Sequence, residues 1–255
     1  MPALPAALAA ADAGLSQTVK AQLRLRELIV GGELAPGRRI AELTLVERLG
    51  MSRTPIRMAL ARLQEEGLLD ALPAGGFAVK DFSEDDIHDA IELRGTLEGL
   101  AARLAAERGV GAVPLAEARE CLEAIDALLA RPKLDEAAFG RYVAANGRLH
   151  DLLAEMCASP VVQRALARAK TLPFASPNGF VLAGALGARA RDSLVVAQAQ
   201  HRALIEAIER REGARAESLM REHARVARSN LVEALRSHRT LQQIPGARLI
   251  RRRAR

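Results

Sequence analysis

Aromatic residues, cysteines and long apolar runs are all scarce in this chain of 255 residues. Phe, Trp and Tyr make up 2% of it, with no tryptophan, so no platform exists on which single-stranded nucleic acid could stack its bases. Cys121 and Cys157 have neither metal-ligand nor redox spacing, and we expect free thiols.

No apolar run reaches the roughly 18 residues of a membrane span. The Ala-rich start lacks a basic region before its apolar part, and its first positive charge is Lys20. A signal peptide is therefore not predicted, and we expect a cytoplasmic protein that does not bind membranes.

The net charge of +6 lies almost entirely at the C-terminal end. Residues 1–80 carry 10 basic and 8 acidic side chains, and residues 81–240 carry 22 and 23. Residues 241–255 carry five arginines and no acid, in a segment that ends ARLIRRRAR. Because the bulk charge is nearly balanced elsewhere, an argument for DNA binding has to depend on where particular arginines lie. We expect this basic C-terminal tail to be a disordered, solvated end, with a nonspecific phosphate contact as the alternative.

The N-terminal third has the element order of a winged helix-turn-helix. After a tail over residues 1–14, a helical pattern runs from Leu15 to Leu34 and is broken by GGELAPG. AELTLVERLG fits a second short helix, and a third helix is predicted from a Ser52 cap to about Glu66. The segment LLDALPAGGFAVK then has two short apolar runs around PAGG, which is typical of a hairpin. We therefore predict a winged helix-turn-helix (α+β) domain over residues 15–80.

From residue 81 to residue 240 the sequence changes to long Ala-, Leu-, Glu- and Arg-rich helical patterns. Short connections between long amphipathic helices indicate an all-α antiparallel bundle, so the whole chain is predicted to be mainly α. The predicted helices cover residues 84–108, 114–130, 135–157, 159–171, 188–211 and 213–238.

The third predicted helix begins with an unusual concentration of polar side chains. Ile56, Leu60 and Leu63 turn inward at helical spacing, which leaves one exposed face at the N-terminal end. That face carries Ser52, Arg53, Thr54 and Arg57. In a helix-turn-helix this end enters the major groove, where Arg pairs with guanine and the helix dipole favours phosphate. The alternative is an ordinary solvated helix start with a serine cap.

The stretch LTLVERLGMSRTPIRMALARLQEEGLLDALPAGGFAV resembles the signature of the GntR family of bacterial transcription regulators, LxxxLGVSRTPVREALxxLxxEGLV followed by a Gly-rich wing. The resemblance covers about 40 residues and implies binding to double-stranded operator DNA, with Ser52, Arg53 and Arg57 as contacts. It also implies that Gly75 and Gly76 let the wing approach the DNA. Two departures concern specificity: Met58 replaces the usual Glu, and Leu43 lies where some members have a further contacting Arg. The base sequence read by relatives is therefore not transferred.

Histidines form the second pattern. Asn146 and His150 are four residues apart and share a helix face, and His201 and His223 lie on two other predicted helices. Three histidines converging in a bundle could bind one divalent ion, since imidazole suits Zn, Ni, Cu or Fe. Without further information, surface or core histidines are the commoner explanation.

The region from about Ser83 to Ser237 resembles the FCD ligand-binding domain of the FadR subfamily, with ELRGTLEGLAARLAA similar to its first helix. By this resemblance Asn146, His150, His201 and His223 hold a divalent metal ion, Zn or Ni first, and Asn146 replaces a commoner Asp. The implied effector is a small organic acid or sugar acid. The implied protein is a homodimeric regulator, with repression the expected mode.

Two further residues are candidates for the effector site. Arg94 could anchor a carboxylate through its guanidinium, and an ion pair with Glu98 at i+4 is the equal alternative. Asn230 lies seven residues after His223 on the same helix face and could line the pocket. A metal-dependent hydrolase is the alternative function, but no histidine has the HExxH spacing that would supply a general base.

Overall fold

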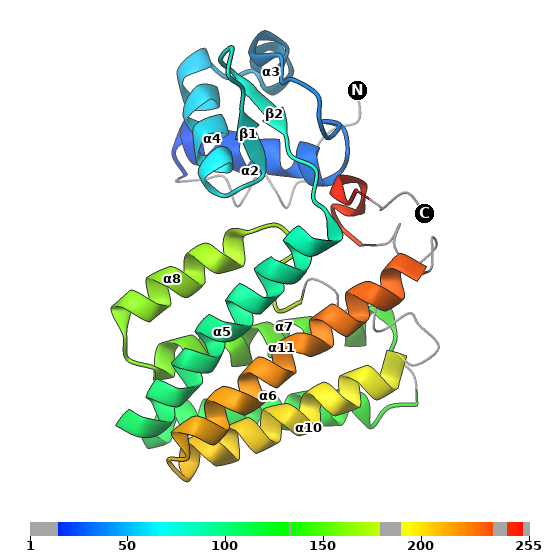
Figure 1. The fold of residues 1–255 in the computed structure, drawn as a ribbon. Coiled ribbons are helices and arrows are strands. Elements are labelled where there is room, and N and C mark those ends of the chain that lie inside the picture. Colours follow the sequence, from blue (N-terminus) through cyan, green and yellow to red (C-terminus); the bar gives the residue numbers. More distant parts are fainter. Residues whose placement is uncertain (1–14, 133, 179–189, 237–243, 252–255) are drawn as a thin grey trace. The chain divides into compact units, whose positions relative to one another are not determined.

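We analysed a computed structural model of the chain, which describes residues 15–132, 134–178, 190–236 and 244–251 (Figure 1). The chain divides into two compact units. The first, here the winged-helix unit, contains the chain up to Ser83 together with the segment from Pro245 onward. The second, here the helical unit, runs from Glu84 to Ile244.

The winged-helix unit has the element order that the sequence predicts. Its elements are α2 (Gln17–Val30), α3 (Glu42–Leu49), α4 (Arg53–Glu65), β1 (Leu69–Ala71) and β2 (Phe77–Val79). Gly50 ends α3 in the left-handed conformation, at φ 62°, and so turns the chain toward α4. The strands pair antiparallel, with Leu69 opposite Val79, and form the predicted hairpin.

Helical periodicity builds the core of this unit. Ala21, Leu25 and Ile29 repeat at a spacing of four residues and are fully buried on α2. The inward residues predicted for α4, namely Ile56, Leu60 and Leu63, are also fully buried. Because α2 packs against α4, these two apolar faces cover each other and leave the opposite face of α4 exposed.

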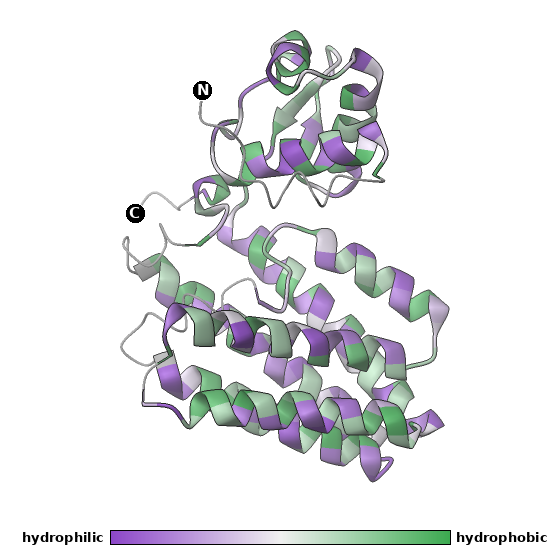
Figure 2. Ribbon diagram, turned by 180° about the vertical axis from the view of Figure 1, so that it is seen from behind, coloured by the Kyte–Doolittle hydropathy of each residue, from purple (hydrophilic) through white to green (hydrophobic). Residues whose placement is uncertain are grey.

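The helical unit is all α in its described residues. It contains α5 (Glu84–Arg108), α6 (Ala112–Leu129), α7 (Glu136–Met156), α8 (Pro160–Thr171), α10 (Ala190–Glu209) and α11 (Gly213–Arg236). Each helix carries both hydrophilic and hydrophobic residues, as Figure 2 shows. None of the described helices is long and apolar enough to cross a membrane.

Small residues let α5 and α11 approach closely. A Cβ atom added at Gly95 would lie 2.5 Å from the Ala224 Cβ atom, and one at Gly99 would lie 2.8 Å from the Arg221 Cγ atom. The two helices lie side by side, and α10 packs against α11 (Figure 1). This arrangement places side chains of α5, α10 and α11 in one interior.

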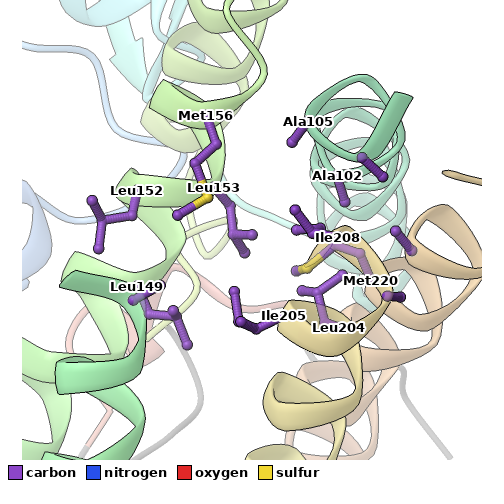
Figure 3. Packing of buried hydrophobic residues seen from close by; sticks show 14 of the residues in the cluster. Ala102, Ala105, Leu149, Leu152, Leu153, Met156, Leu204, Ile205, Ile208 and Met220 are labelled. Atoms are coloured by element: carbon purple, nitrogen blue, oxygen red, sulfur yellow. The ribbon is translucent and has the colours of Figure 1, made fainter. Parts of the chain in front are cut away.

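An apolar cluster closes one end of that interior. Figure 3 shows leucines and a methionine of α7 facing α10, α11 and the alanines of α5. Leu149 precedes His150, Leu204 lies three residues after His201, and Met220 lies three residues before His223. The three histidines of the sequence pattern are therefore adjacent to a well-packed apolar core.

Residues 244–251 of the C-terminal tail differ from the solvated end that the sequence predicts, and residues 252–255 of that tail lie outside the described residues. A short 3₁₀ helix, η1 (Ala247–Leu249), is followed by Ile250, which pairs with Phe82 in a parallel bridge. The Phe82 amide donates to the Leu249 carbonyl at 2.8 Å, and the Arg251 amide donates to the Phe82 carbonyl at 2.8 Å. Leu249 and Ile250 are 1% and 7% exposed. These apolar side chains order the segment up to Arg251, because burying them releases water from their surface.

Candidate DNA-reading surface and metal pocket

The N-terminal end of α4 presents all four polar side chains that the sequence singled out. Ser52, Arg53, Thr54 and Arg57 are all exposed. Ser52 occupies the N-cap position, yet its side chain accepts no capping hydrogen bond. The position expected for the cap was right, but the capping bond is not formed. Pro55, the third residue of the helix, has no N–H and so removes one of the two amides that usually donate to the cap.

The free Ser52 hydroxyl and the unpaired amides of the first turn therefore face outward together. Such a turn is suited to phosphate, since its amides and the helix dipole both attract negative charge. Next to it, Arg57 Nε lies 3.7 Å from Glu42 Oε2 on α3. The large uncharged side chains Leu43 and Met58 are 62% and 49% exposed, at the two places where the sequence departs from the family signature.

The wing ends in a tight turn built by glycine. Gly75 and Gly76 have φ angles of +81° and +87°, in the left-handed region that side chains disfavour. The Gly75 amide donates to the Leu72 carbonyl at 2.8 Å, which closes the turn. A Cβ atom at Gly75 would meet no atom within 4 Å, so the turn is open to a partner.

In the helical unit, three buried histidines converge. His150 of α7, His201 of α10 and His223 of α11 each offer a nitrogen atom, and these atoms all lie within 4.8 Å of one another. His150 and His201 are 1% and 0% exposed, and His223 is 9% exposed. The structure thus brings together three of the four predicted metal ligands from three different helices.

Each histidine is held through its Nδ1 atom. The Nδ1 atoms of His150, His201 and His223 contact Glu98 Oε1, Gln198 Oε1 and Gln200 Oε1, at 2.9, 3.2 and 3.3 Å. The Gln198 amide nitrogen donates to the Leu122 carbonyl and to Asp126, so the oxygen of this side chain must face His201. An oxygen acceptor at each Nδ1 places the ring proton there and leaves a lone pair on Nε2.

Two of the Nε2 atoms lie next to each other. His201 Nε2 lies 3.1 Å from His223 Nε2, and His150 Nε2 is buried with no hydrogen-bond partner among the residues that the structure describes. Burial, and then nearby His150, lowers the pKa of His201 to about 3, and burial lowers the pKa of His223 as well. A proton is therefore a poor partner for the His201 and His223 nitrogens near neutral pH. Their chemistry and arrangement fit a divalent cation, with the Nδ1 acceptors orienting the ligands.

Glu98 is the main residue that sequence reasoning missed in this site. It was considered only as an ion-pair partner of Arg94, and that ion pair is formed. Burial opposes its ionisation, but Arg94 and His150 outweigh burial and lower the pKa of Glu98 to about 2. The Glu98 carboxylate is thus ionised, with one oxygen paired to Arg94 and the other accepting from His150 Nδ1, so it orients the His150 ring.

Asn146 lies beside this cluster, and its amide nitrogen donates to Asn178 Oδ1 at 2.9 Å. A small cavity of about 30 Å³ adjoins it. The polar residues that line this cavity are Arg94, Tyr142, Asn146, Ser193, His223 and Asn230. Asn230 Oδ1 accepts from Ser193 Oγ at 2.8 Å. Arg94 and Asn230 therefore line the same cavity as His223. The sequence offered no signal for Ser193 or Asn178, whereas Gln198 and Gln200 lie three residues and one residue before His201 in AQAQH.

Comparison with protein families identifies the chain. Residues 15–79 match the bacterial regulatory proteins of the gntR family, and residues 89–226 match the FCD domain. The chain belongs to the GntR family of transcription regulators. Within that family it has the FadR-like arrangement, a winged helix-turn-helix followed by an FCD domain. It is therefore a DNA-binding regulator and not the metal-dependent hydrolase that we kept as an alternative.

Individual relatives agree. An HTH-type transcriptional regulator in the TAR-I ttuE-ttuC' intergenic region of Agrobacterium vitis is 39% identical over 131 residues, or 51% of this chain and 74% of the relative. The HTH-type transcriptional regulator McbR of Escherichia coli is 36% identical over 109 residues, or 43% of this chain and 49% of McbR. The solved structure of E. coli McbR has a similar fold, with a TM-score of 0.57 and 22% identity over 87% of this chain and 98% of that one.

Proposed function

We propose that this GntR regulator is a cytoplasmic homodimeric repressor whose operator affinity is controlled by a small carboxylate bound next to a metal ion in the helical unit. The observation that carries the proposal is the convergence of three buried histidines, whose nitrogen atoms lie within 4.8 Å of one another while oxygen acceptors contact each Nδ1 atom. A buried site of this kind has no structural need for three histidines, because apolar side chains would pack there at lower cost.

For operator binding we propose contacts from Ser52, Arg53, Thr54 and Arg57 of the recognition helix and from Gly75 and Gly76 of the wing. All lie in the winged-helix unit and the four side chains are exposed. One recognition helix reads only a few base pairs, so we expect two protomers on a short, imperfectly palindromic operator.

The single variants Arg53→Ala and Arg57→Ala should each weaken operator binding by about 1 to 3 kcal/mol, because each loses a bidentate arginine–guanine contact. Binding to unrelated duplexes should fall much less. The measurement is fluorescence anisotropy with an operator selected from a random duplex library. Arg62→Ala, near the other end of α4, serves as the matched loss of one charge. Unchanged selectivity in both variants would exclude this helix as the reading element.

For the metal we propose His150, His201 and His223 as ligands, with the Asn146 side chain as a fourth and Zn or Ni as the ion. A bound divalent ion would supply positive charge and open positions for a carboxylate. Arg94 and Asn230 would bind the same acid, since both line the cavity and Arg94 Nε has no hydrogen-bond partner within the described part of the chain. A cavity of about 30 Å³ holds only about two water molecules, so an organic acid or sugar acid has to enlarge it. That enlargement is a means by which the ligand changes the helical unit and, through it, DNA binding.

Replacing both His201 and His223 by Ala should abolish high-affinity Zn²⁺ and Ni²⁺ binding and any effect of these ions on operator affinity, while the DNA-binding residues stay intact. Asn146→Asp should instead strengthen the metal site, because it adds a negative charge beside the ion. Calorimetric titration of metal-stripped protein, followed by operator titrations with and without metal, measures both effects. Wild-type metal affinity in the double variant would show that the histidines only fill the core. In a separate experiment, mass spectrometry of the wild-type protein purified under native conditions tests whether an acid is bound.

A further inference from the structure

The short segment that leads from α2 into the first residue of α3, residues 37–42, contacts both proposed DNA-reading elements. The Gly37 amide donates to the Val79 carbonyl and the Ile40 amide donates to the Phe77 carbonyl, each at 2.8 Å. Arg39 forms an antiparallel bridge with Ala78. Ile40 is 5% exposed, so its side chain fastens the segment to the core. The segment is thus held against β2 as an additional edge of the wing.

Arg39 extends from this edge to the turn of the wing. Its Nη2 atom donates to the Gly75 carbonyl at 3.2 Å. A Cβ atom at Gly76 would lie 3.5 Å from the Arg39 guanidinium. Two successive glycines give the turn wide conformational freedom, and a side-chain hydrogen bond to its carbonyl restricts that freedom.

Glu42 extends from the same segment to the recognition helix. It is the first residue of α3, and its carboxylate faces Arg57 Nε at 3.7 Å. The Glu42 side chain is 20% exposed, whereas that of Arg57 is 68% exposed. The carboxylate therefore lies on the inner side of an arginine whose Nη atoms remain available for a base edge.

We propose that Glu42 and Arg39 are positioning residues for operator recognition: Glu42 orients the Arg57 guanidinium, and Arg39 holds the wing turn. This rests on the proposed roles of Arg57 and the wing in DNA binding. A carboxylate at a DNA-facing surface repels phosphates and so lowers the affinity for every duplex. Glu42 offsets this for the correct sequence, because a pre-oriented arginine loses less side-chain freedom on binding. Its net effect is to widen the difference between operator and unrelated DNA.

Glu42→Gln tests the first half of the proposal. Its affinity for unrelated duplex should stay equal or rise, while the ratio of operator to unrelated affinity should fall about 5-fold or more, a part of what one base contact contributes. Glu47→Gln is the matched control, because Glu47 is an exposed acid on the same helix and forms no described hydrogen bond or ion pair with α4. Similar ratios in the two variants would overturn the proposal, since net charge alone would then explain the effect.

A double-variant cycle shows whether Glu42 acts through Arg57. In an Arg57→Gln background, adding Glu42→Gln should leave the affinity ratio unchanged. An additional loss in that background would overturn the positioning role of Glu42 and leave the role of Arg57 intact. If Arg57→Gln alone left the ratio unchanged, the proposed function of Arg57 would fail, and the role of Glu42 with it.

Arg39→Ala and Arg38→Ala test the second half, because these neighbours are both exposed and remove the same charge. Arg39→Ala should weaken operator binding several-fold more than Arg38→Ala. The dependence of log affinity on log salt should be the same for both variants. A direct phosphate contact by Arg39 would instead reduce that slope by about 0.9 relative to Arg38→Ala, and this result would overturn the bracing role.

Discussion

In the metal-free protein, lowering the pH from 6.5 to 5 is expected to reduce the stability of the helical unit by about 2 to 4 kcal/mol. Two buried histidines cause this. Burial lowers the pKa of His201 from 6.5 to about 3 and lowers that of His223 as well. At pH values between the folded-state pKa and the unfolded-state pKa of these histidines, the unfolded chain binds more protons than the folded chain. The free energy of unfolding therefore rises with pH, and it falls as the pH drops below 6.5. Glu98 adds to this only below its ordinary pKa of 4.5.

Urea unfolding in the presence of a chelator, at several pH values, measures the effect. Tyr142 is the single tyrosine and is buried in α7, so its fluorescence reports on the helical unit alone. His201→Gln should reduce the slope of stability against pH by about half, whatever it does to stability at neutral pH. A stability that stays constant from pH 6.5 to 5, or an unchanged slope in His201→Gln, would contradict the buried neutral state of these rings.

Deleting residues 245–255 is expected to destabilise the winged-helix unit and to weaken operator binding because less of this unit is folded. Leu249 and Ile250 are buried in that unit. Backbone hydrogen bonds join Leu249 and Arg251 to Phe82. Leu249→Ala alone should cost about 2 to 4 kcal/mol, the usual cost of removing a buried leucine side chain. The helical unit should be unaffected, as judged by Tyr142 fluorescence.

Arg251→Ala is the matched control for the deletion. It removes a charge from the same segment, and its side chain is 64% exposed and 3.7 Å from Asp81, so we expect a change of under about 1 kcal/mol. Circular dichroism during urea unfolding, combined with operator titration, separates the two explanations. A deletion that leaves unfolding unchanged but flattens the salt dependence of DNA binding would support a phosphate-binding tail instead.

Local patterns in the sequence were sufficient for the order of elements. The helices follow from apolar residues at every third or fourth position, and the end of α3 follows from Gly50. The hairpin follows from the PAGG turn. Each of these signals involves only residues that are close together in the sequence. The resemblance of the SRTP region to the GntR signature and of the later helices to FCD domains rests on the same local information, and the family is confirmed. The roles of Arg53, Arg57 and the metal ligands remain predictions.

The packing of helices that are distant in the sequence determines which side chains share a site. Glu98, Gln198 and Gln200 hold the histidines because α5, α7, α10 and α11 pack around one interior, and no spacing in the sequence encodes that meeting. Burial, which lowers the histidine pKa values, is likewise a property of the packed bundle. The arginines of the C-terminal segment predict a solvated end from the sequence. Its apolar residues Leu249 and Ile250 are buried instead, because folding brings Phe82, which is distant in the sequence, next to them. The helices, the hairpin and the family follow from neighbouring residues and could be predicted. The pocket, its charge states and the C-terminal anchor depend on contacts between distant residues and could not.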